Sequence, residues 1–252
     1  MRRVDVHLQE HVADAQRRAL TVRDDDFDLI HGGHPGKIPR RRRVVFCAHA
    51  SWEVYAPSMG KVFDAIDPNL RSWIEEQPLW FVATAPLGAD GHVNVSPRGH
   101  DTFSVLDPHR VAWVDYTGSG VETIAHIREN GRVCLMFASY GKRPRIVRLH
   151  GTGEVFLPGE ATFEDVVARH PEHPSTRAVI TVDVTRISDS CGWGVPIMEK
   201  TGERDLLRLR AEKKGADGMA QYRAERNARS IDGLPGLPLE SAESSGRRAE
   251  TD

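Results

Sequence analysis

Six segments between residues 78 and 190 have the apolar, β-branched composition of strands, and they limit what this chain can fold into. Most of them are joined by connections of hairpin length, which favours antiparallel pairing, and few helical segments lie between them. The sequence therefore predicts a mainly β (α+β) fold, an antiparallel barrel with peripheral helices and a helical C-terminal extension. The six segments are 78–86, 92–97, 110–117, 132–140, 143–158 and 176–190.

The helical segments are few and carry clear boundary signals. Asp67 followed by Pro68 is a good helix start, and Leu70, Trp73 and Ile74 then form an apolar stripe at helical spacing. A second helix is expected after residue 119 and a third over residues 161–170. The charged region after residue 203 predicts two helices, each punctuated by glycine.

The ends of the chain differ in composition from the strand-rich region. Residues 1–58 contain an acidic run and a run of four arginines without a sustained apolar period, so we interpret them as a disordered or loosely packed extension. Met59 begins a stretch that resembles a natural protein start, so a start assigned too far upstream is an alternative hypothesis. The predicted domains are therefore 1–58 (extension), 59–200 (barrel), 201–238 (helical extension and arm) and 239–252 (disordered tail).

Charge and composition restrict the class of function. The formal net charge of −2 provides no electrostatic basis for binding nucleic acid or an anionic membrane, and no apolar run is long enough to span a bilayer. The three cysteines, Cys47, Cys134 and Cys191, are far apart and predict neither a disulfide framework nor a zinc site. A reducing, cytoplasmic location is the simplest expectation. The two His-x-x-His pairs lack a third ligand, so no metal site is predicted.

The turn Thr117-Gly118-Ser119-Gly120 follows one predicted strand and precedes a helix. Ser119 and Glu122 match a capping box, in which both side chains satisfy amides of the first helical turn. The same features also suit an anion, because free amides, hydroxyls and the positive end of the helix dipole converge there. The local sequence leaves both interpretations open.

Three arginines are candidates for a neighbouring cation. Arg98 ends the strand that contains Ser96, and its planar guanidinium suits a phosphate if it lies beside the turn at residues 117–120. Arg145 and Arg148 are three residues apart, so a regular strand would point them to opposite faces, and one of them at most serves a given site. A solvated or edge-strand charge is the alternative in each case.

Three stretches, taken together and in order, resemble the pyridoxamine 5'-phosphate oxidase-like proteins. They are "FVATAPLGADGHVNVSPRG", "DYTGSGVETIAHIRENGRVCLMF" and "RIVRLHGTGEV". The resemblance extends from Met59 to about Leu237. Within the family, the chain looks most like a bacterial subgroup that also carries "DSCGWGVP". It implies a six-stranded split β-barrel, a homodimer, and FMN at the subunit interface. No nucleic acid or membrane partner is implied.

The resemblance also suggests which residues contact the cofactor. Arg98 would supply a phosphate-binding cation beside Ser96, and the strand end Asp115-Tyr116-Thr117 would run along the flavin ring. Ser119 and Thr123 would bind the phosphate, Arg145 or Arg148 would lie near the ring, and Trp193 would cover a ring face or be a buried structural residue. No catalytic residue is identified.

The sequence departs from the oxidases at one informative place. Gly120-Val121 stands where the oxidases carry an Arg-Lys pair, which implies fewer cations around a phosphate, and the signature for pyridoxamine phosphate is not recognisable. We therefore expect a flavin-dependent oxidoreductase acting on an unknown small molecule rather than an authentic pyridoxamine 5'-phosphate oxidase. The alternatives are a deazaflavin-dependent reductase, a non-enzymatic flavin- or haem-binding protein, and an interaction module without cofactor.

Overall fold

The structure is a computed structural model that describes residues 60–238. The expectations for the 1–58 extension, for a start at Met59 and for the 239–252 tail lie outside the described residues. Cys47 and the pair His31 and His34 also lie outside them.

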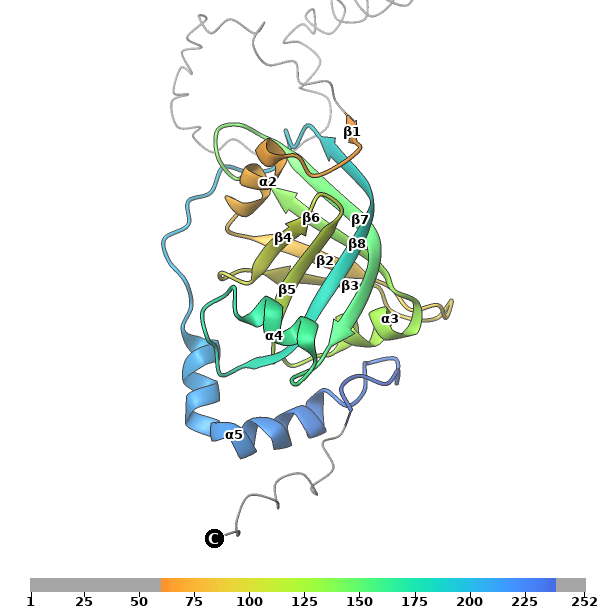
Figure 1. Cartoon of the computed structure of the whole chain (residues 1–252), viewed down its shortest axis with the longest axis vertical. Coiled ribbons are helices and arrows are strands. Elements are labelled where there is room, and N and C mark those ends of the chain that lie inside the picture. Colours follow the sequence, from red (N-terminus) through yellow and green to blue (C-terminus); the bar gives the residue numbers. More distant parts are fainter. Residues whose placement is uncertain (1–59, 239–252) are drawn as a thin grey trace, which may run out of the picture. The chain divides into compact units, whose positions relative to one another are not determined.

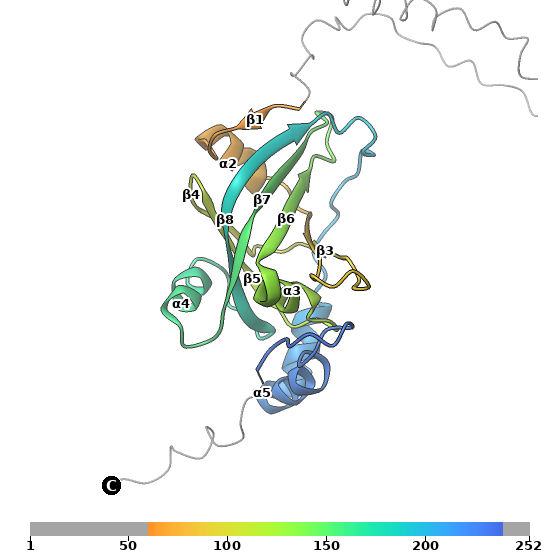
Figure 2. The ribbon, with the colours of Figure 1, turned by 90° about the vertical axis from the view of Figure 1, so that its right-hand side faces the viewer.

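Eight strands form one antiparallel sheet in the order β3-β2-β6-β7-β8-β5-β4, with β1 paired to β8 (Figure 1). The strands are β1 (Val62–Phe63), β2 (Trp80–Thr84), β3 (Asn94–Arg98), β4 (Phe103–Asp107), β5 (Arg110–Tyr116), β6 (Arg132–Ala138), β7 (Ile146–Phe156) and β8 (Thr176–Ser190). The helices are α2 (Pro68–Glu75), α3 (Glu122–Asn130), α4 (Ala161–Val167) and α5 (Leu206–Arg226). Helices α2 and α5 lie at opposite ends of the sheet (Figure 2).

The predicted fold class is confirmed, and all six expected strands are present as β2, β3, β5, β6, β7 and β8. Strands β1 and β4 come in addition to the six. The first has only two residues, and the second is a five-residue strand joined by a tight turn at Pro108 to β5. Both are too short for a strong alternation to mark them in the sequence.

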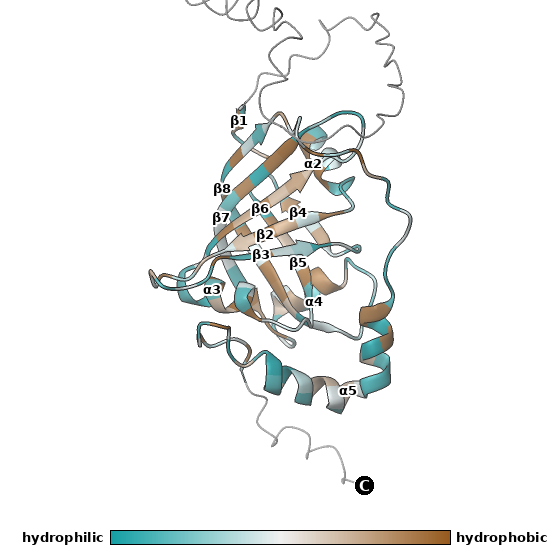
Figure 3. Ribbon diagram, turned by 180° about the vertical axis from the view of Figure 1, so that it is seen from behind, coloured by the Kyte–Doolittle hydropathy of each residue, from teal (hydrophilic) through white to brown (hydrophobic). Residues whose placement is uncertain are grey.

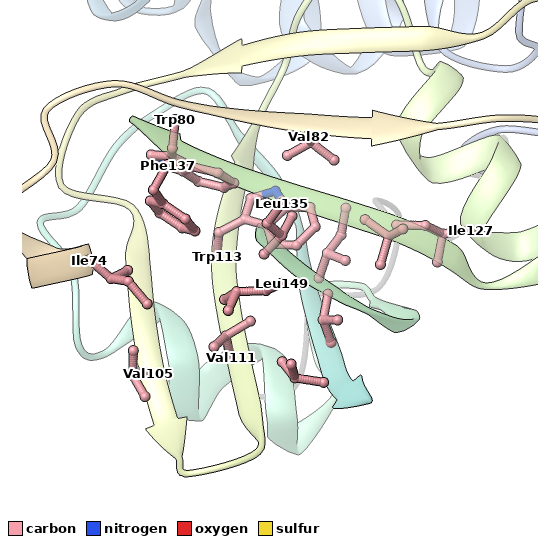
Figure 4. Close-up of a cluster of buried hydrophobic side chains, with 14 of the residues drawn as sticks. Ile74, Trp80, Val82, Val105, Val111, Trp113, Ile127, Leu135, Phe137 and Leu149 are labelled. Carbon is pink, nitrogen blue, oxygen red and sulfur yellow. The ribbon is translucent and has the colours of Figure 1, made fainter. Parts of the chain in front are cut away.

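The core lies inside the curved sheet because the strands alternate inward and outward residues. Trp80 and Val82 of β2 are buried, whereas Phe81 and Ala83 between them are partly exposed. The ring of Trp80 lies 5.1 Å from Phe103 of β4 and 5.7 Å from Phe137 of β6. Strands β2 and β4 are not neighbours in the sheet, so the contact of Trp80 with Phe103 crosses a shared interior. Figure 4 shows part of this interior, with Trp80 beside Phe137.

The two longest strands bend at a glycine. The register between β7 and β8 shifts at His150 and Gly151, and a Cβ atom at Gly151 would lie 2.2 Å from the carbonyl oxygen of Asp183. Only glycine allows that close approach of two backbones. A glycine inside a long β-rich segment is the sequence signal typical of such a bulge.

The helix boundaries follow the sequence signals, with one correction. Asp67 caps α2 by accepting a hydrogen bond from the Leu70 amide at 2.8 Å, and α5 is broken at Gly215, which has φ 68°. Helix α3 does not start with the predicted capping box. It begins at Glu122 after Val121, without a side-chain cap, and the Glu122 carboxylate accepts from the Ile231 amide of the C-terminal arm instead.

Candidate functional site

A cavity of about 550 Å³ lies where strands β3 and β5 end, and we call it the Arg98 cavity. Its walls are the ends of those strands, the turn that starts at Thr117 and the segment that leads into α5. Arg98, His100, Tyr116 and Tyr140 line it together with Lys200 and Glu203. Cavities of roughly 300–1,000 Å³ hold drug-sized ligands and cofactors in proteins, so this one is large enough for a ligand of that size.

A buried carboxylate holds the wall of the cavity together. Asp115 of β5 is fully buried, with its Oδ1 2.6 Å from Arg98 Nη1 and its Oδ2 2.6 Å from Arg177 Nε. Burial alone would raise the pKa of Asp115, but the charges of Arg177 and Arg98 outweigh burial and hold this pKa below its ordinary value. Asp115 belongs to the strand end that is predicted to run along the flavin ring. In the structure its side chain pairs with two arginines of the protein.

Arg98 lines the cavity and has one hydrogen-bond donor that is not used by any other described residue. Its side chain is 18% exposed, and one nitrogen pairs with Asp115. Its Nε atom is buried and has no hydrogen-bond partner within the described residues. An orphaned donor of this kind indicates a position where a ligand oxygen would improve the hydrogen bonding.

The three predicted hydroxyls are used differently. Thr117 is buried, and both its amide and its Oγ1 donate to the carbonyl oxygen of Ser175, at 2.7 and 2.9 Å. Thr123 is buried and its Oγ1 accepts from Asn94 Nδ2 at 3.0 Å. Ser119 is exposed and lines a small neighbouring cavity of about 140 Å³. Of the three, Ser119 is the hydroxyl open to a ligand.

Two residues that the sequence did not single out fix the turn at residues 117–120. Arg177 donates to the Gly120 carbonyl at 2.9 Å, and the buried Asn227 donates to the carbonyls of Gly118 and Gly120 at 3.2 and 3.4 Å. An arginine directly before the mostly apolar, buried run 178–182 is a signal that could have identified Arg177. Asn227 follows a charged helix and carries no comparable signal.

Aromatic rings form the next part of the wall. Tyr116 stacks on His173 with 4.0 Å between ring centroids, and His100 lies 6.0 Å from Tyr116. Burial raises the pKa of Tyr116, and burial together with Arg208 and His100 lowers the pKa of His173. His100 has φ 60°, an uncommon backbone conformation for a residue with a side chain.

Ser96 belongs to a polar network that runs from β3 into the protein. Its Oγ donates to Asn94 Oδ1 at 3.1 Å, and Asn94 Nδ2 donates to Thr84 Oγ1 at 3.2 Å. Thr84 Oγ1 then lies 3.0 Å from Nδ1 of the buried His126, whose Nε2 has no partner within the described range. Burial lowers the pKa of His126 despite acidic residues nearby.

His126 predicts a loss of stability in mild acid. Because its pKa is lowered in the folded protein, the unfolded chain binds the proton first, and the free energy of unfolding falls as the pH drops below about 6.5. Urea unfolding between pH 8 and pH 5 should show this fall, and His126→Gln should reduce its slope. Equal slopes in the two proteins would contradict the assignment.

The structure separates Arg145 from Arg148. Arg145 Nη2 lies 3.2 Å from Asp189 Oδ2, and its guanidinium lies over the rings of Trp73 and Phe63 at 5.0 and 5.4 Å, which is a structural arrangement. Arg148 of β7 instead donates from its Nη1 to Ser190 Oγ at 3.1 Å. The two therefore differ in surroundings, and Arg145 lies just before β7 rather than within it. Which of them faces a cofactor stays a prediction.

Trp193 is 67% exposed. The interpretation of Trp193 as a buried structural residue is therefore wrong. Its predicted contact with a cofactor ring is still a prediction.

Strands β3, β2, β6 and β7 carry both hydrophobic and hydrophilic residues (Figure 3). We call the side of these strands that points away from the core the outer face. The cross-strand register places two rows of residues there. Val95 and Pro97 of β3 lie at its edge and are both exposed. The two rows are Pro97, Phe81, Met136, Arg148 and Val95, Ala83, Cys134, His150.

Two types of site are absent from residues 60–238. In this part of the chain no three His, Cys, Asp or Glu side chains are grouped so that they could hold a metal ion. Over the same residues, no helix combines the length and apolar character needed to cross a bilayer.

Comparison with known proteins gives a consistent match. The model of the family described as "Pyridoxamine 5'-phosphate oxidase" matches residues 66–191. Among characterised sequences, the chain is 41% identical over 192 residues to "Pyridoxamine 5'-phosphate oxidase family protein ustO" of Aspergillus flavus, covering 69% of this chain and 77% of that protein.

Solved structures with the same type of fold are more distant. HupZ from Group A Streptococcus is 23% identical, and the match covers 48% of this chain and 91% of that chain, with a TM-score of 0.38. The FAD binding protein from Mycobacterium smegmatis is 15% identical, and the match covers 51% of this chain and 97% of that chain, with a TM-score of 0.37. At these TM-scores the likenesses bear on neither ligand nor activity.

Proposed function

Because the chain belongs to the pyridoxamine 5'-phosphate oxidase family, we propose that it is a flavin-dependent oxidoreductase that binds FMN in the Arg98 cavity and acts on a small molecule. The observation that carries the proposal is Arg98, which presents a buried, unpartnered Nε at the wall of a cavity of about 550 Å³. An anionic cofactor group would supply the acceptor that this nitrogen lacks within the described residues.

The residues around the cavity suit such a cofactor. Arg98 would hold an anionic group, exposed Ser119 would donate from the neighbouring turn, and Tyr116 would provide an aromatic surface. Asp115 and Arg177 would act indirectly. They hold Arg98 and the turn in position and would not contact the ligand through their side chains. A bound flavin would supply the redox chemistry, and the protein would orient it and exclude water.

The turn and helix start that would hold the anionic group of the cofactor carry little charge. Gly120 and Val121 stand where two cations are expected in the oxidases, and Val121 is buried against the arm residue Gly236. Binding would therefore depend on Arg98, on hydroxyl and amide donors of the turn, and on Lys200 and Arg204, which also line the cavity. Because the two cations are missing, a deazaflavin coenzyme and haem stay alternative ligands. The absence of these cations also argues against authentic pyridoxamine 5'-phosphate oxidase activity. Membership of a bacterial subgroup and a cytoplasmic location stay predictions.

Reduction of the cofactor separates an enzyme from a binding protein. We expect the purified protein to take up FMN and to lose the absorption of oxidised flavin when NADPH or NADH is added without oxygen. A flavin that binds but is reduced no faster than free FMN would favour a non-enzymatic binding protein. Binding of haem or a deazaflavin coenzyme in place of FMN would support the corresponding alternative.

We also propose that the chain forms a homodimer through the outer face, with the cofactor beside the interface. Exposed Val93 and Val95 give this face an apolar edge, and Arg148 adds a cation within it. Burial of such a patch against a second copy would remove apolar surface from water.

A charge on the outer face should therefore weaken the dimer. Val95→Asp is expected to raise the dimer dissociation constant at least tenfold, as measured by analytical ultracentrifugation, because an unpaired carboxylate would be buried. Ala168→Asp on the exposed surface at the end of α4 is the matched control and should leave the dimer intact. A dimer equally stable in both variants would place the interface elsewhere.

A further inference from the structure

A second cavity, of about 690 Å³, runs along strand β4 and the end of α4, and we call it the Ser104 cavity. Ser104, His170 and Asp101 all line it, and none of them has a role in the flavin proposal. The cavity is large enough for a small organic molecule.

The three side chains are arranged as a nucleophile, a base and an acid. Ser104 Oγ lies 2.8 Å from His170 Nε2. The other ring nitrogen, Nδ1, lies 3.4 Å from Asp101 Oδ1, which is an ion-pair distance, and it has no hydrogen-bond partner within the described residues. The His170 side chain is only 4% exposed, so its ring is held in place, whereas Asp101 is 73% exposed. This order of groups is recognised by geometry and roles and recurs on unrelated folds.

The fold brings these residues together from distant parts of the sequence. Strand β4 turns Phe103 and Val105 into the core, so Ser104 between them points to the face that α4 covers. Helix α4 packs there through Phe163 and Val166. The chain continues one further turn to His170, whose amide donates to the Val167 carbonyl at 3.0 Å, and its ring then reaches Ser104.

Strand β4 is the last strand of the sheet formed by residues 60–238, so among these residues one side of its backbone has no neighbouring strand. The Val114 amide of β5 donates to the Thr102 carbonyl, so in an antiparallel ladder Thr102 and Ser104 face β5. The amide of Phe103 between them points to the open edge beside Ser104. An amide directed to this edge could stabilise negative charge on an acyl oxygen.

We propose that Ser104 and His170 form a second, flavin-independent site that transfers an acyl group from a small ester to water. Ser104 Oγ bonds to the acyl carbon while its proton passes to His170 Nε2, and that proton then leaves with the alcohol as the ester bond breaks. Water attacks the acyl-serine in the second step and returns a proton through His170 to Ser104. The products are one carboxylic acid and one alcohol. Asp101 is a positioning residue that favours the proton on Nδ1.

A purely structural role is the competing explanation, in which the same hydrogen bond fastens α4 to β4. The two differ in reactivity, because only an activated serine displaces fluoride from a fluorophosphonate and becomes phosphonylated. We expect mass spectrometry of the full-length protein treated with a fluorophosphonate to find the modification on Ser104. We also expect turnover of p-nitrophenyl acetate above the rate of free imidazole.

Matched variants make the test specific. Ser104→Ala should abolish both labelling and turnover while FMN binding is unchanged, and Ser72→Ala, an exposed serine on α2, should retain both. Asp101→Asn should lower kcat at least tenfold with little change in KM, because Asp101 acts on the ring and not on the ester. Absence of label on Ser104, or turnover that persists in Ser104→Ala, would overturn the proposal, as would a full kcat in Asp101→Asn.

Discussion

Replacing Asp115 with alanine is expected to lower the free energy of unfolding by about 3–5 kcal/mol, because it leaves buried positive charge unpaired. Asp115 lies between Arg98 and Arg177, each with a nitrogen 2.6 Å from a carboxylate oxygen, and the Arg177 side chain is almost fully buried. Urea unfolding followed by circular dichroism measures the loss.

A surface ion pair provides the control for this variant. Asp183 lies 3.4 Å from Arg110 in an exposed position, so Asp183→Ala should change the free energy of unfolding by less than about 1 kcal/mol. If Asp115→Ala were as mild as Asp183→Ala, the buried cluster would not be a main support of the cavity wall.

The same cluster sets the behaviour in strong acid. The pKa of Asp115 is lowered in the folded protein, so its contribution to stability is present above its unfolded pKa of about 3.9 and is lost as the pH falls through the folded value. This window lies well below that of His126, so the two groups can be distinguished by pH.

Replacing Arg98 with alanine should weaken FMN binding by about 1.5–3 kcal/mol, the range for a hydrogen bond to a charged group. Asp115 keeps Arg177 as a partner in this variant, so the chain is expected to stay folded. Fluorescence titration with FMN measures the dissociation constant, and circular dichroism checks the fold.

Arg110→Ala is the matched control, since Arg110 lies outside the Arg98 cavity and pairs with an exposed aspartate. Its dissociation constant for FMN should equal that of the wild type. An unchanged constant in Arg98→Ala would remove Arg98 from the site.

The strands and their irregularities could be predicted because their signals are local. Apolar, β-branched segments identified six of the strands, a glycine lies at the bulge where two backbones touch, and Asp67-Pro68 marked the start of α2. Gly215 likewise marked the break in α5. Each of these depends on a backbone conformation or a face that a few neighbouring residues determine.

The use of the polar side chains could not be predicted in the same way. Thr117 and Thr123 looked available for a phosphate, but Ser175 and Asn94, which are distant in the sequence, occupy their hydroxyls. Glu122 failed to cap α3 because the C-terminal arm offers it the Ile231 amide. Hydrogen-bond partners are set by tertiary contacts, which a local motif does not contain.

The cluster around Asp115 shows what a sequence can indicate and what it omits. Asp115 and Arg98 were both recognised as site residues, but their direct pairing and the part played by Arg177 depend on the register between β5 and β8. A charged residue directly before a mostly apolar run was the available signal for Arg177, since burial of such a group requires a partner.

Titration of the purified full-length protein with FMN by isothermal calorimetry tests the central claim most directly. We predict saturable binding of one FMN per chain that is weakened in Arg98→Ala and unaffected in Arg110→Ala. An absence of binding to FMN, or binding that is equally strong in Arg98→Ala, would contradict the assignment of the Arg98 cavity as a flavin site.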